Sequence, residues 1–511
     1  MKALLQRHIW EIVFLFGLCS LAFFLRSYAL YRDLFFAFDQ GRDAWEIVKM
    51  QQGDLTLIGP VTGLAGVFLG PFWYYLLFPL YWIGNGNPVV PALGMIALHT
   101  FCVAIIYSIS KRIANWKAGV ISSVLFTISF SNIMFSRWLS NPAPLPFFSL
   151  LSFICVWKAL TTKKSQFFIL AGILFGLCMQ LEAANAVWYI PTVALLYAYE
   201  VLFVEKNLSS IKEKLLVFFR WGIFTALGFG ITLAPQMLFE MKWNFLISKN
   251  LLTAFETTHS ITLAESLPTR LRLLFELYSR GMIGDRIILG LPILALLLIL
   301  LFALRRQFYQ NRGLRIIISW FMVPLFFHAI YTGNFGNFWD YYVVAQHVPL
   351  YIMIGSLIGL GITLFPRAKL LLTSLMVFFL ISSVVLNYER WKGFLTPYAD
   401  RFSLQMQVEA TKWIASKAGS TRYGTWVYTP DAQDQAHRYV FYWIGRQLQS
   451  MPGQHVEQEP LIFMVVEDDA GHAKRRSEWI ATNQTFGNLI ETKKFGAITV
   501  FMMENTFITQ Q

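Results

Sequence analysis

FDQGRDAWEIVKMQQGDLTLIGPVTGLAGVFLGPFWYYLLFPLYWIG, residues 38–84, is the stretch that decides the fold of this chain. It follows the first long apolar run almost directly. In it, acids, a base, a glycine-rich connector and an aromatic run crowd together as nowhere else in the sequence. The polar residues Asp39, Arg42 and Asp43 come first, the connector covers 53–70, and the aromatic residues follow. The stretch therefore indicates a loop at a membrane face that carries chemically active side chains.

The rest of the chain is dominated by apolar runs. Of its 511 residues, 56% are hydrophobic and 14% are charged, a composition that excludes a single soluble globule and indicates a polytopic membrane protein. A span needs roughly 17–25 apolar residues to cross a hydrocarbon core about 30 Å thick. We therefore predict a mainly α membrane bundle of about eleven spans, near residues 9–29, 88–109, 118–136, 143–160, 167–181, 184–204, 217–236, 286–304, 315–331, 345–364 and 370–386.

The basic residues predict the orientation of this bundle. We leave out the uncharged run 67–83 as a span, because including it would reverse every later loop. The Lys- and Arg-rich loops at 110–117, 161–166, 205–220, 305–315 and 366–369 then share a side with the N-terminus. The positive-inside bias places that side in the cytoplasm. The net charge of +13 is thus an orientation signal, and we expect no nucleic-acid partner.

Two segments remain outside the spans. The outward loop 30–87 is expected to carry two short interfacial helices, one over 43–52 and one between Pro71 and Pro79, whose aromatic rings suit the headgroup level. The tail 387–511 alternates expected helices at 402–418, 432–448 and 474–483 with expected strands at 424–430, 460–467 and 496–503. We therefore predict a membrane core over 1–386 and a small, soluble, extracytoplasmic α/β domain over 387–511.

The order of these features resembles the C-type glycosyltransferase (GT-C) superfamily, and in particular its protein O-mannosyltransferases and aminoarabinose transferases. The likeness is carried by Asp39-Gln40, by Gly53-Asp54, by the run GPFWYY at 70–75 and by SRWLSNPAPLPFF at 136–148. The likeness of the motifs is confined to residues 30–150. The likeness of the overall architecture covers roughly residues 1–390. Gln40 stands where those families have a second acid, and Asn141 stands where relatives often have one.

The resemblance implies a GT-C-like fold and an inverting sugar transfer at a cell inner membrane. The donor would be a sugar on a polyprenyl-phosphate carrier, and the acceptor a lipid, a glycan or a protein. A catalytically degenerate protein that only binds the lipid-linked sugar is one alternative. A lipid or glycan transporter is a weaker one, because the chain lacks repeated halves and shows few charges at mid-membrane depth.

Such a transfer needs a carboxylate that removes the acceptor proton and cations that hold the leaving phosphate. We expect Asp39 to be the base, or alternatively to cap a helix over 40–52. Arg42 and Arg137 are the candidate phosphate ligands, because a guanidinium pairs with phosphate oxygens. Asp43 either ligates a divalent metal together with Asp39, contacts the substrate, or pairs with Arg42 or Lys49.

Four further residues are candidates for substrate binding. Glu182 is an acid at membrane depth, where acids are costly and often functional, although solvation in a helix turn is an equal alternative. Asp340 lies beside aromatic residues in an outward loop, where lining the surface is the main alternative role. Asn141 belongs to the turn at 136–148, and Tyr74 to the interfacial aromatic run.

Overall fold

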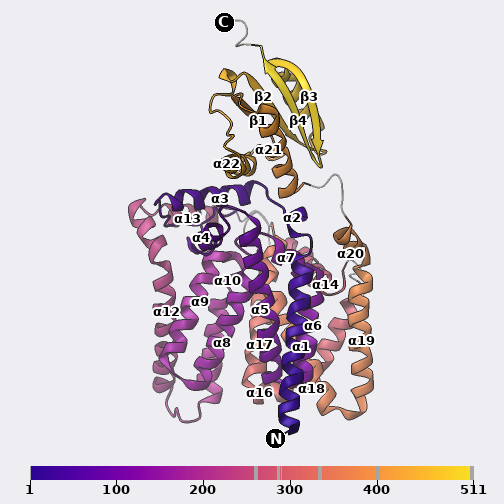
Figure 1. The fold of residues 1–511 in the computed structure, drawn as a ribbon. Coiled ribbons are helices and arrows are strands. Elements are labelled where there is room, and N and C mark those ends of the chain that lie inside the picture. Colours follow the sequence, from indigo (N-terminus) through magenta and orange to yellow (C-terminus); the bar gives the residue numbers. More distant parts are fainter. Residues whose placement is uncertain are drawn as a thin grey trace.

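The computed structural model describes residues 2–257, 263–284, 288, 290–331, 337–396 and 402–506. Within them, a bundle of long helices carries a small α/β domain at one end, and the N-terminus lies at the other end (Figure 1). The predicted architecture, a mainly α membrane bundle with a small C-terminal sheet domain, is therefore confirmed.

The apolar helices form the bundle. In the described residues, eight helical stretches are long and apolar enough to cross a membrane, and the pair α6 and α7, bent by 59°, would make a ninth. Two shorter apolar helices, α9 and α15, complete the set, so that each predicted apolar run is helical where it is described. The helices are α1 (Lys2–Ser27), α5 (Val89–Ile113), α6 (Trp116–Ile128), α7 (Phe130–Arg137), α8 (Leu145–Thr162), α9 (Ser165–Leu181), α10 (Ala183–Ala186), α11 (Tyr189–Tyr199), η1 (Glu200–Val204), α12 (Ile211–Lys242), α15 (Gly290–Ala303), α17 (Arg312–Ile330), η4 (Asp340–Gln346), α18 (His347–Leu364), η5 (Pro366–Ala368) and α19 (Lys369–Leu386).

Shorter helices cover the ends of the bundle. The helix α3 lies across its upper end, directly beneath the α/β domain, and α4 lies beside it (Figure 1). Both expected short helices are present, but α3 begins earlier than predicted and α4 continues through Pro79, and their interfacial position stays a prediction. The other helices of the membrane part, α3 and α4 included, are α2 (Leu30–Asp33), α3 (Phe38–Gln51), α4 (Phe72–Ile83), α13 (Leu246–Thr257), the 21-residue α14 (Leu263–Ile283), α16 (Arg305–Gln310) and α20 (Tyr388–Leu395).

Small residues let α9 and α12 approach closely. A Cβ added at Gly172 would lie 1.9 Å from the carbonyl oxygen of Thr225, and one at Gly228 would lie 2.0 Å from that of Ile169. Gly176 fits in the same way against the hydroxyl of Thr232. In lipid, where helices gain little from the hydrophobic effect, such contacts supply packing and bring backbones together. The glycines therefore set the short distance between the backbones of α9 and α12.

A buried carboxylate gathers positive charge far from α3. Glu200 pairs with Lys163 at 3.3 Å, with Arg315 at 3.6 Å and with Arg312. The neighbouring helix α16 lies at the same end of the bundle as the N-terminus (Figure 1). The basic loops used to predict the orientation therefore include residues that also neutralise an acid buried inside the bundle.

The C-terminal domain contains a four-stranded sheet in the order β1-β2-β4-β3. Its strands are β1 (Tyr423–Tyr428), β2 (Leu461–Glu467), β3 (Gly487–Phe495) and β4 (Ile498–Asn505), and its helices are α21 (Leu404–Ala418), α22 (Gln435–Leu448), the one-turn η6 (Val456–Gln458) and α23 (Ala473–Gln484). β1 and β2 are parallel, whereas β4 pairs antiparallel with β2 and β3.

The central strand β2 is buried on both faces. Phe463 and Val465 pack with Trp413 of α21, while Ile462 and Met464 face the other side, toward Trp479 of α23. This double burial explains why β2 reads as a continuous apolar run rather than as an alternating pattern. The sequence prediction located β1, β2 and β4 correctly and missed β3.

Candidate active site

The helix α3 begins one residue before Asp39. Its N-cap, Ala37, has an extended backbone, and the side chain of Gln40 accepts a hydrogen bond from the N–H of Ala37 at 3.0 Å. The Gln40 amide also donates to the carbonyl of Leu139 at 3.0 Å. Gln40 therefore fixes the start of α3 to the turn that follows α7. The alternative in which Asp39 caps a helix over 40–52 is wrong, because Phe38 is already helical.

Arg42 joins the two predicted acids. Its Nη1 donates to Oδ1 of Asp39 at 2.8 Å, while Nε and Nη2 donate to Oδ1 of Asp43 at 2.9 and 2.7 Å. Asp39 and Asp43 thus share one face of α3, as their spacing of four residues predicts. The two acids differ in exposure, since the side chain of Asp39 is 53% exposed and that of Asp43 is 4% exposed. Only Asp39 offers a carboxylate oxygen to a molecule from outside.

Asp43 is held from both sides. Besides Arg42, the indole Nε1 of Trp73 donates to its Oδ2 at 2.7 Å, and the hydroxyl of Tyr74 lies 3.4 Å from its Oδ1. Burial raises the pKa of Asp43, and the charge of Arg42 together with the Trp73 hydrogen bond opposes that rise only in part. Of the roles left open for Asp43, the structure shows the pairing with Arg42, and it adds a link between α3 and α4. Tyr74 is buried within the protein, next to Asp43.

Glu182 lies at the junction of α9 and α10. It is buried, and its Oε1 accepts the N–H of Ala184 at 3.1 Å. Burial raises the pKa of Glu182 to about 7, with the hydrogen bond from Ala184 opposing the rise. The protonated form of Glu182 therefore persists to a higher pH than in an ordinary carboxyl.

Tyr341 lies near both Glu182 and the acid on α3. Its phenol lies within electrostatic range of both Glu182 and Asp39, and its ring lies 5.7 Å from that of Trp138. Asp39 and Glu182, which are far apart in the sequence, therefore both lie near Tyr341. Sequence reasoning missed Tyr341. Its position directly after Asp340, in an aromatic run of an outward loop, was the available signal.

The turn at 136–148 packs beside this region. The side-chain amide of Asn141 donates to the carbonyl of Leu181 at 2.6 Å, next to Glu182. His99 bonds the carbonyl of Ala143 in the same turn at 2.7 Å. Asn141 therefore positions the segment that leads into Glu182, and its predicted contact with substrate stays a prediction.

Arg137 and Asp340 have different surroundings. Nη1 of Arg137 donates to the carbonyls of Arg26 and Tyr28 at 3.0 and 2.6 Å, and its guanidinium lies 4.7 Å above the ring of Phe394. These contacts make Arg137 a buried link between α1, α7 and α20. Asp340 is exposed at the first position of η4. Substrate roles for Arg137 and Asp340 therefore stay predictions.

The carboxylate oxygens around Asp39 do not form a set of ligands that fits a divalent metal. Oδ1 of both acids already accepts from the guanidinium of Arg42. Within the described ranges, moreover, no group of three or more His, Cys, Asp or Glu side chains is placed to hold a metal ion. Metal sites for Mg²⁺ or Mn²⁺ normally gather several oxygen ligands. We therefore assign no step to a metal.

The C-terminal domain packs directly on α3. A Cβ at Gly41 would lie 2.3 Å from the backbone nitrogen of Ala436, so that α3 and α22 meet through their backbones. The hydroxyl of Tyr439 donates to the carbonyl of Gly86 at 2.7 Å. The side chain of Gln407 also donates to the carbonyl of Phe36 at 2.6 Å. The start of the helix that bears Asp39 is thus held between the bundle and the C-terminal domain (Figure 1).

Solved structures with the same arrangement were found by comparison. ArnT from Cupriavidus metallidurans in the apo state matches with a TM-score of 0.54 and 11% identity, over 97% of this chain and 98% of that one. The undecaprenyl phosphate-bound form of ArnT matches with a TM-score of 0.53 and 11% identity, over 96% and 98%. The archaeal oligosaccharyltransferase AglB from Archaeoglobus fulgidus, in complex with an inhibitory peptide and a dolichol-phosphate, matches with a TM-score of 0.50 and 11% identity, over 98% and 75%.

These matches identify the fold. This chain has the fold of ArnT and AglB along nearly its whole length, in agreement with the GT-C resemblance of its sequence. No protein-family model matches the sequence, and the search of curated proteins found no match.

Proposed function

We propose that this protein is an integral-membrane glycosyltransferase that moves a sugar from a polyprenyl-phosphate carrier to an acceptor at the outer face of the membrane. The observation that carries the proposal is the half-exposed carboxylate of Asp39, which Arg42 holds at the start of α3. Tyr341 lies near this carboxylate and near Glu182. The fold supports it, since the matched ArnT and AglB structures contain undecaprenyl phosphate and a dolichol-phosphate.

Asp39 is the proposed general base. Its Oδ1 is engaged by Arg42, which leaves Oδ2 to take the proton of an acceptor hydroxyl. As that proton moves, the acceptor oxygen forms a bond to the anomeric carbon of the donor sugar. The bond from that carbon to the lipid phosphate breaks, and its electron pair leaves with the phosphate. Attack from the side opposite the phosphate gives inversion.

Glu182 is the proposed acid at the leaving group. With a pKa of about 7, it is partly protonated at neutral pH and can donate a hydrogen bond to the phosphate as negative charge develops there. Asp39 and Glu182 then form a pair of carboxyl groups with different environments, one half exposed and one buried. Because of this difference in environment, one carboxyl group can act as a base and the other as an acid at the same pH.

The placement of the site fits a carrier embedded in a membrane. The helix α3, which bears Asp39, lies at the end of the bundle opposite the N-terminus (Figure 1), and the basic loops favour a cytoplasmic N-terminus. The sugar would therefore be transferred on the extracytoplasmic side of a cell inner membrane. The acceptor of the proposed reaction is a lipid, a glycan or a protein.

The test is donor consumption by the purified full-length protein in lipid nanodiscs. The donors to supply are undecaprenyl phosphate carrying aminoarabinose, glucose or mannose, each with and without a crude extract of cell-envelope lipids and glycans as acceptor source. Release of free undecaprenyl phosphate is measured by chromatography and mass spectrometry. We expect release with at least one donor, and release at least about 100-fold slower in Asp39→Asn. The matched control is Glu46→Gln on the same helix, whose side chain pairs with Lys49.

Two results would contradict the proposal. If every donor binds but none is consumed, the protein is a lipid-linked-sugar binding protein. If Asp39→Asn consumes donor as fast as the wild type, the assigned base is wrong.

A further inference from the structure

A cavity of about 290 Å³ lies between the C-terminal domain and the start of α3. From the membrane part it is lined by Phe35 and Phe38, on either side of Ala37. From the soluble domain it is lined by Phe402 and by residues that follow β1 and β2. Its volume is near the lower end of the range found for small-molecule sites, about 300 Å³. The proposed mechanism leaves this cavity unused.

The cavity lies at the carboxyl ends of two parallel strands. β1 ends at Tyr428 and is followed by the lining residues at 429–431, and β2 ends at Glu467 and is followed by Asp468. The helix α22 connects the two strands, which pair in parallel. In open α/β sheets, ligands bind in the crevice outside the carboxyl ends of the strands. The cavity therefore occupies the position where this sheet type places its ligands.

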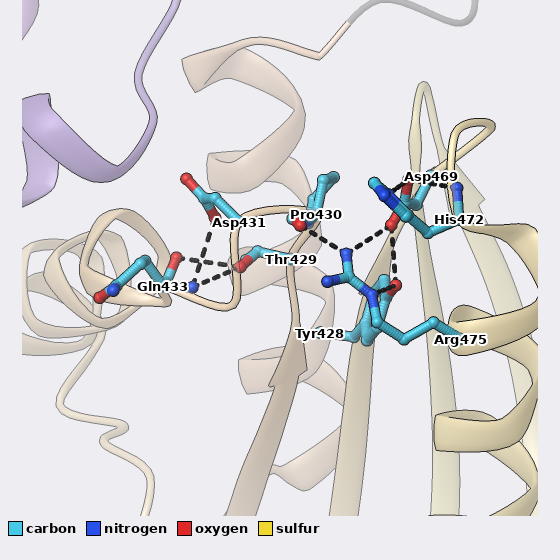
Figure 2. A network of polar contacts seen from close by, with 8 residues as sticks. All are labelled: Tyr428, Thr429, Pro430, Asp431, Gln433, Asp469, His472 and Arg475. Carbon is cyan, nitrogen blue, oxygen red and sulfur yellow. Dashed lines mark hydrogen bonds and ion pairs between the residues drawn. The ribbon is translucent and has the colours of Figure 1, made fainter. Parts of the chain in front are cut away.

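Hydrogen bonds fix the loop that forms one wall. The N–H of Gln433 donates to Oγ1 of Thr429 at 2.8 Å and to Oδ1 of Asp431 at 3.3 Å. Arg475 holds the same loop from behind, because its Nη2 donates to the carbonyl of Pro430 and to Oδ2 of Asp469 (Figure 2). The wall is thus formed before a ligand arrives, which lowers the entropy lost on binding.

The polar side of the cavity is acidic. Glu467 accepts from Nε2 of His437 at 2.7 Å, and Asp468 pairs with Arg476 at 2.6 Å. Asp431 is exposed, and in the described part of the chain it forms no ion pair. Arg475 forms an ion pair with Asp469, in which Nη2 of Arg475 lies 2.8 Å from Oδ2 of Asp469. Among the described residues that line the cavity none is Lys or Arg, so the acidic side chains there disfavour a phosphate or another anion.

Aromatic side chains form another part of the lining. Phe35 and Phe402 lie with ring centroids 6.0 Å apart in an edge-to-face arrangement, and the Phe35 side chain is half exposed. An aromatic ring packs against C–H groups through its negative face, and carboxylates accept hydrogen bonds from hydroxyl or ammonium groups. A ligand ring with an apolar face and with hydroxyl or ammonium hydrogens at its edge can pack against the phenylalanine rings and donate hydrogen bonds to the carboxylates at the same time. A saccharide has that shape.

We propose that this cavity binds a saccharide unit of the acceptor, neutral or carrying a free amine. The proposal rests on the proposed sugar transfer and narrows its acceptor to a glycan or a glycolipid. Phe38 lines the cavity and is followed at once by Asp39. If one sugar unit of a glycan were bound in the cavity, the next sugar unit would lie at the start of α3, where the proposed base lies.

The test measures saccharide binding without any donor. The full-length protein in nanodiscs is titrated with three probes: the trisaccharide of glucosamine, its N-acetylated counterpart and a galacturonic acid trisaccharide. Binding is followed by isothermal titration and by saturation-transfer NMR. We expect the first two probes to bind and the anionic one to fail. Phe35→Ala and Asp431→Asn should each weaken binding at least about tenfold, since both side chains are exposed and neither change threatens folding.

Two controls separate this proposal from the proposed function. Asp434→Asn changes an acid of the same loop that pairs with Arg438 and does not line the cavity, so binding should not change. Asp39→Asn should also leave binding intact while transfer is lost. Wild-type protein that binds none of the probes, or variants that bind as the wild type does, would overturn the saccharide site even if donor is consumed. Intact binding without donor consumption would contradict only the transferase proposal.

Discussion

Gly41 and Ala436 touch through their backbones. A Cβ on Gly41 would lie 2.3 Å from the backbone nitrogen of Ala436 and 2.5 Å from its Cα. The first residue belongs to the helix that bears Asp39, and the second lies in α22 of the soluble domain. Only glycine fits at this contact without moving one helix. The position of the proposed base therefore depends on a domain that begins more than three hundred residues later in the sequence.

Gly41→Ala should disturb both stability and transfer. Forcing an extra methyl into a packed contact costs typically about 1–3 kcal/mol, and the obstacle here is backbone, which cannot rotate away. We expect a lower temperature of unfolding and a slower release of undecaprenyl phosphate. Thermal unfolding followed by intrinsic fluorescence, together with the donor-consumption assay, measures the two effects.

The control for this change is Gly222→Ala in α12, where a Cβ would meet nothing within 4 Å. That substitution in an open helical position should be neutral or slightly stabilising. Equal behaviour of the two variants would show that the contact between α3 and α22 is not tight.

Trp73→Phe should destabilise the link between α3 and α4. The indole N–H donates to Oδ2 of Asp43, which is 4% exposed, so that its loss leaves a buried carboxylate oxygen without this donor. A buried group that loses its hydrogen bond costs about 1–3 kcal/mol. Trp82→Phe on the same helix is the control, because Trp82 is 70% exposed. Chemical denaturation should separate the two variants, and a Trp73→Phe protein as stable as Trp82→Phe would contradict this account of Asp43.

The rate of transfer should fall as pH rises through about 7. Burial raises the pKa of Glu182 to about 7, so the carboxyl is protonated below that pH and ionised above it. The proposed hydrogen bond to the leaving phosphate needs the protonated form. Activity should therefore be retained on the acid side of this transition and lost on the alkaline side.

Glu182→Gln tests the origin of this pH dependence. Its amide is neutral at every pH and keeps a donor in the same place. A pH–rate profile of this variant should lack the loss near pH 7 while keeping part of the wild-type activity. An unchanged alkaline loss in Glu182→Gln would assign the titration to another group.

Chelation should leave transfer unchanged. Asp39 and Asp43 both bind Arg42, and the described ranges hold no cluster of three or more side chains suited to a metal ion. We expect donor consumption in excess EDTA to stay within about twofold of the untreated rate. A loss that Mg²⁺ or Mn²⁺ restores would mean that the pairing with Arg42 gives way to a metal when substrate is present.

Much of the fold could be predicted from the sequence. Long apolar runs and the distribution of Lys and Arg locate the helices, because membrane length and loop charge act on each segment separately. The same reasoning predicted the short helix α4 outside the spans. β3 was missed because its exposed, polar sequence, with residues such as Glu491 and Lys493, lacks the apolar signal of a buried strand.

The candidate site was harder to predict, since its contacts join distant segments. The pairing of Arg42 with Asp39 follows from helical spacing and was within reach of sequence reasoning. The hydrogen bond from Trp73 to Asp43 and the proximity of Tyr341 to Asp39 depend on packing that no local pattern encodes. The start of α3 was placed late because its N-cap is Ala37, which is not a typical capping residue, and Gln40 supplies the stabilising contact instead.

The most direct measurement is the single-turnover rate of undecaprenyl phosphate release by Asp39→Asn and wild-type protein, with donor binding measured in parallel. A base that removes the acceptor proton acts on the chemical step and not on donor affinity. The account predicts donor binding within about twofold of the wild type and a rate at least about 100-fold slower. A wild-type rate in Asp39→Asn, with the donor bound and consumed, would contradict it.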